Sequence, residues 1–115
     1  MLQKNNTNLS IVIPVFNEKK YLYKLFGQIT FYFNHSENEV IFIDDGSNDG
    51  SSTILKEIKE KKNYKFALKV IKLDINSGKG KAIQTGIKNS EGKYVLLQDA
   101  DLELDIKDAK EMYDM

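Results

Sequence analysis

At 115 residues, the chain is long enough for one domain with a single hydrophobic core and too short for several. Its 17 basic residues, all of them lysines, balance 17 acidic ones, so no net charge favours nucleic acid or an anionic membrane as a partner. The absence of cysteine excludes disulfides, thiolate catalysis and sulfur-based zinc sites.

The N-terminal residues 1–8 are mostly polar and lack the pattern of a signal peptide. No apolar run in the sequence approaches the length needed to span a membrane. We therefore expect a flexible segment at residues 1–8, a folded domain at residues 9–115 and a cytoplasmic location.

The first predicted strand is a β-branched run at residues 9–15, which contains the only proline, Pro14. Asn17 and Glu18 follow at once, where a helix must begin. Apolar residues then recur at helical spacing, which predicts a helix over residues 22–34.

The second predicted strand, residues 40–43, ends in Asp44 and Asp45. A turn rich in Gly, Ser and Asn follows, and Asp49 or Ser51 is placed to cap the next helix. Three apolar residues at helical spacing form the inner face of that helix: Ile54, Leu55 and Ile58.

A third strand is predicted at residues 66–73, followed by a glycine- and lysine-rich loop at residues 76–81. The helix after this loop has a narrow apolar face, formed by Ala82, Ile83, Gly86 and Ile87. The fourth predicted strand, residues 95–97, is a short apolar run, which is typical of a strand buried on both faces. A last helix is expected from about Asp105, with Ile106, Ala109 and Met112 on its inner face.

Strands that alternate with helices at this spacing predict an α/β fold with a parallel sheet, right-handed crossovers and helices on both faces. Ligands of such sheets bind beyond the carboxyl ends of the strands, near the switch in strand order. The polar segments 14–18, 44–50, 76–81 and 99–103 all fall at those ends. Together they predict a binding site at one edge of the sheet.

The acids after the fourth strand, Asp99, Asp101 and Glu103, are spaced two residues apart. An unpaired carboxylate costs several kcal/mol to bury, so these side chains must meet water or a cation. Ligands that offer only oxygen suit Mg²⁺ or Mn²⁺, which also bind substrate phosphates. The segment therefore indicates a divalent metal site.

The other polar segments fit a nucleotide. The Asp45 carboxylate can accept a hydrogen bond from a base N–H or a ribose hydroxyl. Gly78 and Gly80 let the backbone approach a diphosphate, whose charge Lys79 or Lys81 can neutralise. With the metal offsetting charge on the departing group, these features describe a nucleoside diphosphate bound as a leaving group.

Three other phosphate-binding folds fit poorly. Residues 78–81 lack the spaced Gly and the following Ser or Thr of a P-loop. No Gly-x-Gly-x-x-Gly follows the first strand, as a dinucleotide fold requires. The acids at 44–45 suit a phospho-acceptor receiver domain, but the acids at 99–103 do not. The sole histidine, His35, lies in a polar stretch and is interpreted as a surface residue.

Four blocks, IVIPVFNE at 11–18, IDDGSNDG at 43–50, NSGKGKA at 76–82 and QDADLE at 98–103, resemble in order and spacing the family 2 glycosyltransferases. Within that family they are most similar to the transferases that use dolichyl or polyprenyl phosphate. The resemblance covers nearly all of residues 9–108.

The resemblance implies a GT-A fold, in which α/β/α layers surround a mainly parallel sheet, and inverting transfer of a sugar from a UDP- or GDP-sugar to a polyprenyl or dolichyl phosphate. It implies a metal site with Mg²⁺ or Mn²⁺ on Asp99, Asp101 and Glu103. It also implies a nucleotide-sugar site formed by Pro14, Val15, Asn17, Glu18, Asp44, Asp45, Gly78, Lys79, Asp99 and Ala100.

This sequence departs from the family pattern in two ways. Ile106 stands where a proline often follows the acidic block. Family members also continue for roughly another hundred residues, which fits the size expected of a two-substrate enzyme. The acceptor site and general base are therefore expected beyond residue 115, together with contacts that hold the full-length protein at the cytosolic face of a membrane.

Two alternative functions remain open. The chain can be a nucleotide-binding fragment without catalysis, because the acceptor half is absent. It can also be a nucleotidyltransferase, although the sequence lacks a convincing Arg-containing phosphate loop.

Overall fold

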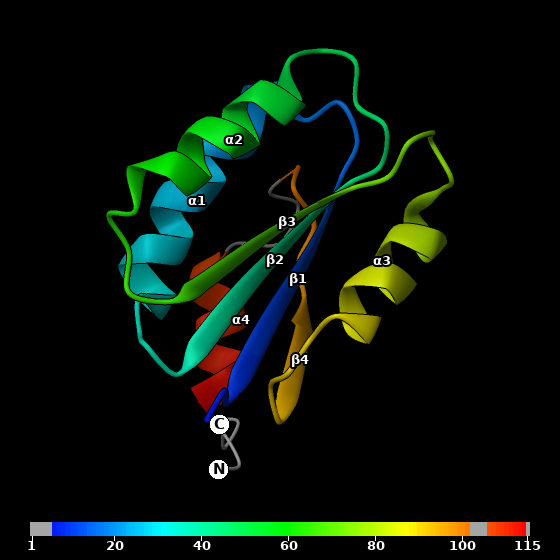
Figure 1. Cartoon of the computed structure of the whole chain (residues 1–115). Helices are drawn as coiled ribbons and strands as arrows, with labels where there is room; N and C mark the ends of the chain where they lie inside the picture. Colours follow the sequence, from blue (N-terminus) through cyan, green and yellow to red (C-terminus); the bar gives the residue numbers. More distant parts are fainter. Residues whose placement is uncertain (1–5, 102–105, 115) are drawn as a thin grey trace, which may run out of the picture.

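The computed structural model describes residues 6–101 and 106–114. Four parallel strands form one sheet in the order β3-β2-β1-β4. Helices α1, α2 and α4 cover one face and α3 covers the other (Figure 1). The elements are β1 Leu9–Val15, α1 Lys19–Phe33, β2 Asn38–Asp44, α2 Ser51–Lys61, β3 Ala67–Lys72, α3 Lys79–Lys88, β4 Tyr94–Leu97 and α4 Ile106–Asp114.

The two central strands carry the hydrophobic core on both of their faces. Ile11 and Phe42 are fully buried on the face covered by α1 and α2, whereas Val12 and Ile43 are buried on the face covered by α3. A side chain at Gly86 would place its Cβ 2.4 Å from Val12 Cγ1, so this glycine permits the close approach of α3 to the sheet. The predicted α/β arrangement is confirmed.

The fourth strand does not have the environment that the sequence predicted. Tyr94, Val95 and Leu97 are 61%, 41% and 46% exposed, because β4 lies at the edge of the described sheet. Only Leu96 of this strand packs against the main core. The prediction of a strand buried on both faces was therefore wrong. A run of apolar side chains shows that a strand is hydrophobic, but it does not show whether the strand lies at the centre or at the edge of the sheet.

Two helix faces also differ from expectation. Ala82 and Gly86 are buried in α3, but Ile87 is 46% exposed, because the short α3 meets the sheet only through its small residues. Met112 of α4 is 66% exposed, whereas Tyr113 packs against the core beside Phe33, with ring centroids 6.5 Å apart. No helix within residues 6–101 and 106–114 is long and apolar enough to cross a membrane.

Strand register sets the position of the loops at the carboxyl edge. Val15 pairs with Asp44, so β1 and β2 end at the same level of the sheet. The Asp45 backbone N–H donates to the Val15 carbonyl oxygen at 2.8 Å and continues this alignment beyond the strands. As a result, the loop after β1 lies directly against the loop after β2.

Asn17 joins these two loops. Its backbone N–H donates to Ser47 Oγ at 3.0 Å, and its side-chain Oδ1 accepts from the Asn48 backbone N–H at 2.8 Å. Asn17 has a φ of 54°, in the left-handed region that Asn tolerates better than most residues. The backbone of the β1–α1 loop therefore depends on this residue.

Asp49 ties the first turns of α1 and α2 together. Its carboxylate accepts from the Lys19 backbone N–H at 3.1 Å and from the Ser51 backbone N–H at 2.9 Å, while Ser51 Oγ accepts from the Glu18 backbone N–H at 3.1 Å. Gly50 occupies the N-cap position of α2, with a φ of 101° and no side-chain cap. Asp49 or Ser51 was expected at this position, and neither occupies it. Burial opposes ionisation of Asp49, but a hydrogen bond from the Ser51 hydroxyl and those from the two backbone N–H groups outweigh it and lower the pKa of Asp49.

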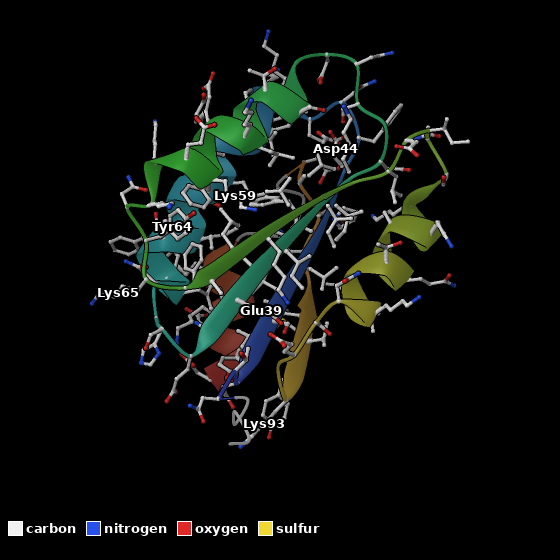
Figure 2. All side chains as sticks on the ribbon, viewed as in Figure 1. Glu39, Asp44, Lys59, Tyr64, Lys65 and Lys93 are labelled. Atoms are coloured by element: carbon white, nitrogen blue, oxygen red, sulfur yellow. The ribbon has the colours of Figure 1, made fainter. Side chains whose placement is uncertain are left out.

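At the opposite end of the sheet, Glu39 forms a buried polar network; Figure 2 shows Glu39 and Asp44 near opposite ends of the sheet. Glu39 accepts from Ser10 Oγ and from the Glu91 backbone N–H, both at 2.5 Å, and its Oε1 lies 3.0 Å from Lys69 Nζ. Burial alone would raise the pKa of Glu39, but the hydrogen bonds and the ammonium group outweigh it and lower that pKa. The network fastens the α3–β4 turn to the sheet.

We predict that Glu39→Gln lowers the free energy of unfolding by about 2 kcal/mol at pH 7, because an amide cannot replace a carboxylate facing two donors and an ammonium. Urea unfolding measures this change. Glu91→Gln is the control: its carboxylate is 3.5 Å from the same Lys69 and its side chain is 60% exposed, so the loss should stay below about 0.5 kcal/mol.

The stabilisation by Glu39 should also depend on pH. The folded pKa lies below the ordinary value of 4.5, so the contribution is complete above that value and is lost as the pH falls through the folded pKa. The difference between the parent and Glu39→Gln should therefore shrink below about pH 4.5. A difference that stays constant down to pH 3, about 1.5 units lower, would contradict this assignment.

We further predict that Asn17→Ala destabilises the domain by about 2 kcal/mol, because it combines left-handed strain with a lost hydrogen bond. Asn17→Gly relieves the strain and should lose only about half as much. Asn48→Ala, which keeps the backbone donor, should change stability by less than about 0.5 kcal/mol. Thermal unfolding of the three variants tests the order; equal stability of the Ala and Gly variants would show that the φ of Asn17 is not strained.

Candidate functional site

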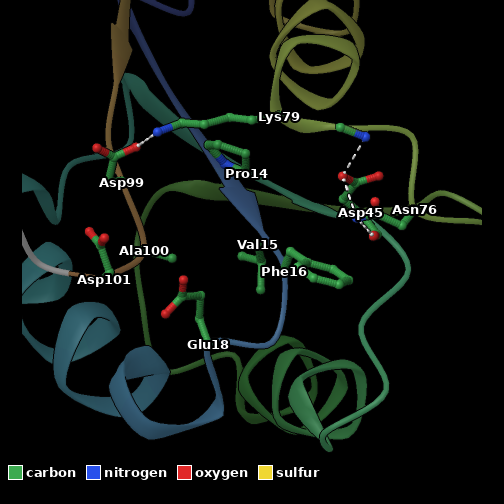
Figure 3. Close-up of a pocket in the computed structure, with 11 residues that line it drawn as sticks. Pro14, Val15, Phe16, Glu18, Asp45, Asn76, Lys79, Asp99, Ala100 and Asp101 are labelled. Atoms are coloured by element: carbon green, nitrogen blue, oxygen red, sulfur yellow. Dashed lines mark hydrogen bonds and ion pairs between the residues drawn. The ribbon is translucent and has the colours of Figure 1, made fainter.

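A cleft of about 330 Å³ opens at the carboxyl ends of the strands. It lies where the chain order reverses, since β2 and β3 follow on one side of β1 and β4 lies on the other. Residues from all four loops line it (Figure 3): Pro14, Val15, Phe16, Glu18, Asp45, Asn76, Gly78, Lys79, Asp99, Ala100 and Asp101. The sequence predicted this location and most of these residues.

Asp44 and Asn17 do not line the cleft, although both were predicted in the nucleotide-sugar site. Asp44 is 1% exposed, and its carboxylate accepts from the Ser47 backbone N–H at 2.9 Å and from the Ser52 hydroxyl. Asn17 is occupied with the neighbouring loop, as described above. Both residues hold the loops after β1 and β2 in place, and these loops carry several residues that line the cleft. Glu103, the third predicted metal ligand, lies outside the described residues.

Two residues of the cleft were missed in the sequence. Phe16 is 45% exposed, and Asn76 donates from Nδ2 to the Asp45 carboxylate at 3.1 Å. Both belong to the polar segments that mark the sheet edge. For Phe16 the sequence did carry a signal. It is a large aromatic residue just after the strand that contains Pro14, at a position where no helix or strand could bury it.

Asp45 is the anchor of the loop that leads into α3. It is 2% exposed, and its carboxylate accepts from the backbone N–H groups of Ser77 at 2.7 Å and Gly78 at 2.9 Å, as well as from Asn76. A carboxylate has about four lone-pair positions, of which three serve the loop here. One position is left for a hydrogen bond from a ligand in the cleft.

Gly46, which follows Asp45, makes this arrangement sterically possible. It has a φ of 76°, and a Cβ added to it would lie 2.6 Å from the Asn76 backbone nitrogen. Any larger residue would therefore push the loop away from the Asp45 carboxylate. The Asp-Gly pair at the end of β2 is what lets the loop after β3 fold over it.

Lys79 is the first residue of α3, and its ammonium forms an ion pair with the Asp99 carboxylate across the mouth of the cleft (Figure 3). The side chain of Lys79 is 62% exposed and that of Asp99 is 29% exposed. The first turn of α3 borders the cleft as well, and helix N-termini favour anions. This side of the cleft can therefore hold a phosphate group.

Asp99 and Asp101 both line the cleft, on the segment that follows β4. Their donor atoms are all carboxylate oxygens, which fits Mg²⁺ or Mn²⁺ ions that keep several of their waters. No group of three or more His, Asp or Glu side chains within the described residues is placed to hold a metal by itself. These two carboxylates therefore fit part of a metal site that a ligand or further residues would complete.

Comparison with known proteins agrees with the family resemblance of the sequence. The family model described as glycosyl transferase family 2 matches residues 10–115. A dolichyl-phosphate beta-glucosyltransferase of Dictyostelium discoideum is 32% identical over 96% of this chain and 36% of its own length. An undecaprenyl-phosphate 4-deoxy-4-formamido-L-arabinose transferase of Aeromonas hydrophila is 38% identical over 86% of this chain and 31% of its own length. The chain thus spans about a third of the length of these relatives.

Solved structures show the same fold. TarS of S. aureus in complex with UDP has a TM-score of 0.75 and 31% identity, over 94% of this chain and 32% of that one. The mannosyltransferase PcManGT of Pyrobaculum calidifontis, in complex with GDP-Man and Mn²⁺, shares the fold with a TM-score of 0.76 at 23% identity, over 82% of this chain and 27% of that one. The expected GT-A fold is confirmed, and the chain belongs to glycosyl transferase family 2.

Proposed function

We propose that this domain binds the nucleoside diphosphate sugar of a glycosyltransferase that inverts the sugar's anomeric centre and transfers it to a polyprenyl or dolichyl phosphate. One observation carries the proposal: a single cleft combines the buried acceptor Asp45, the helix-borne Lys79 and the paired acids Asp99 and Asp101. Relatives named for dolichyl and undecaprenyl phosphate support the acceptor class. Structures with UDP, UDP-GlcNAc and GDP-Man support the donor class.

The nucleoside is placed at the Phe16 side of the cleft. Phe16 offers an exposed aromatic face on which a base can stack, and the remaining lone-pair position of Asp45 can accept from a base N–H or a ribose hydroxyl. The base that stacks on Phe16 and the N–H or hydroxyl that binds Asp45 are both neutral groups. Because Asp45 is already held by the loop, it would present this acceptor without reorganising.

The diphosphate is placed at the other side of the cleft, next to Lys79 and the first turn of α3. Asp99 and Asp101 would hold Mg²⁺ or Mn²⁺. The metal would neutralise the negative charge that develops on the leaving nucleoside diphosphate. Pro14, Val15 and Ala100 close the apolar side of the cleft.

No described residue is assigned as the general base. The acceptor site and the base are proposed to lie in the additional sequence that the longer relatives have, since the chain spans about a third of their length. A lipid-phosphate acceptor would place the enzyme at the cytosolic face of a membrane. The family assignment favours glycosyl transfer over the alternative of a nucleotidyltransferase.

A second candidate follows from the same difference in length. The isolated chain can bind the donor without transferring its sugar, as a nucleotide-binding fragment would. In that case nucleotide binding persists, while neither transfer to a lipid phosphate nor hydrolysis of the nucleotide sugar is detected. Turnover by these 115 residues alone would rule the fragment out.

We predict that UDP or GDP raises the thermal stability of the domain only when Mn²⁺ is present, and that ATP does not. A ligand at about 100 times its dissociation constant should add roughly 2.7 kcal/mol to the free energy of unfolding. Asp99→Asn and Asp101→Asn should remove the effect, whereas Asp74→Asn, an exposed acid outside the cleft, should keep it. Equal binding by all three variants would refute the metal assignment.

We also predict that Phe16→Ala weakens nucleotide binding by roughly 5- to 150-fold, the usual range for loss of one stacked base. Isothermal titration with UDP or GDP in Mn²⁺ measures the change. Phe31→Ala is the matched control, because Phe31 is 78% exposed at the far end of α1 and does not line the cleft. The base lies elsewhere if both variants bind like the parent.

A further inference from the structure

The ion pair between Lys79 and Asp99 links two groups to which the proposed function gives different ligands. Lys79 is placed beside the diphosphate, and Asp99 beside the divalent metal. In the structure the ammonium of Lys79 reaches across the cleft and contacts the Asp99 carboxylate (Figure 3). Neither side chain can make its proposed ligand contact fully while this pair persists.

The charges around the cleft make this pair consequential. Among the described residues that line the cleft, Lys79 is the only cation, and four are carboxylates: Glu18, Asp45, Asp99 and Asp101. A diphosphate entering without a cation would meet an excess of negative charge. A divalent cation that approaches Asp99 would meet the positive charge of Lys79 at close range. The charges present therefore oppose the diphosphate by itself, and Lys79 weakens the attraction that the carboxylates offer to the cation.

We propose that Lys79 competes with the divalent cation for the Asp99 carboxylate. When the cation displaces the Lys79 ammonium from Asp99, the ammonium becomes available to bind the diphosphate. This inference rests on the proposed function and adds a coupling between its two ligands. Binding of either ligand prepares the site for the other, and by linkage the coupling acts equally in both directions. The high exposure of Lys79 and its flexible stem allow the ammonium to move.

The mechanism gives one substitution two effects of opposite sign. Lys79→Met removes the ammonium and keeps most of the length of the side chain. It should tighten binding of Mn²⁺ alone, because the competitor for Asp99 is gone, and weaken binding of UDP or GDP, because the diphosphate loses a cation. A lysine that formed only a surface ion pair would produce neither effect, and one that served only the diphosphate would produce the second alone.

The test is titration of the protein with Mn²⁺ in the absence of nucleotide, with free Mn²⁺ followed by electron paramagnetic resonance. Lys79→Met should bind Mn²⁺ up to about fivefold more tightly than the parent, because Mn²⁺ no longer has to displace Lys79 from an exposed ion pair of that strength. Lys79→Arg keeps the charge and should resemble the parent. Lys88→Met, an exposed lysine at the far end of α3, controls for the change in net charge.

A double substitution shows whether the effect passes through Asp99. In an Asp99→Asn background, Lys79→Met should no longer tighten Mn²⁺ binding, because the carboxylate that both cations share is absent. A gain that persists in this background would overturn the proposal, as would unchanged or weaker Mn²⁺ binding by Lys79→Met alone. Circular dichroism of each variant is the control for an intact fold.

Nucleotide binding distinguishes this inference from the proposed function. Titration with UDP and GDP in saturating Mn²⁺ should show binding by the parent and binding by Lys79→Met that is at least about fivefold weaker. Absence of nucleotide binding by the parent would refute the proposed function. Metal-dependent nucleotide binding together with an unaltered Mn²⁺ affinity in Lys79→Met would uphold the function and refute the competition alone.

Discussion

The hydrogen bonds to the Asp45 carboxylate hold the cleft together. Asp45 directly follows β2, yet its carboxylate accepts hydrogen bonds from Ser77, Gly78 and Asn76, which belong to the segment after β3. The start of α3, and with it Lys79, is therefore placed by a residue that lies more than thirty positions earlier in the chain. Gly46 makes the close approach possible because it has no Cβ. A buried carboxylate that accepts several hydrogen bonds can serve as such an anchor without a counter-ion.

The two ends of the sheet use the same chemistry for different purposes. At the amino ends of the strands, Glu39 is buried, accepts from Ser10 and the Glu91 backbone and pairs with Lys69, and we assign it a role in stability only. At the carboxyl ends, Asp99 remains partly exposed in a cleft that carries more negative than positive charge. An engaged carboxylate stabilises a fold, whereas carboxylates gathered in an open cleft favour a cationic ligand. This contrast separates Glu39 from the acids that we assign to the metal, Asp99 and Asp101.

The polar residues after β1 and β2 show how closely structure and function share one segment. Asn17, Asp44 and Asp49 belong to blocks that the family resemblance marks as functional, but their side chains bind neighbouring loops. Sequence patterns report that such residues are suited to turns and ligands alike, because the same oxygens accept from a backbone N–H or from a substrate. Only the folded positions of Asn48, Ser52 and Lys19 reveal which donors the side-chain oxygens of Asn17, Asp44 and Asp49 meet.

The sequence by itself determined the alternation of strands and helices and the buried faces of β1 and β2, because both follow from local periodicity. It also determined that four polar segments gather at one edge of the sheet, because parallel strands all end at the same edge. Strand order, and with it the exposed edge position of β4, was decided only by tertiary structure, since an apolar run such as Val95–Leu97 does not encode its neighbours. The same holds for the inward turn of Asp44, the presence of Phe16 in the cleft and the pairing of Lys79 with Asp99. Each depends on contacts between segments that are distant in the chain, which local sequence patterns do not specify.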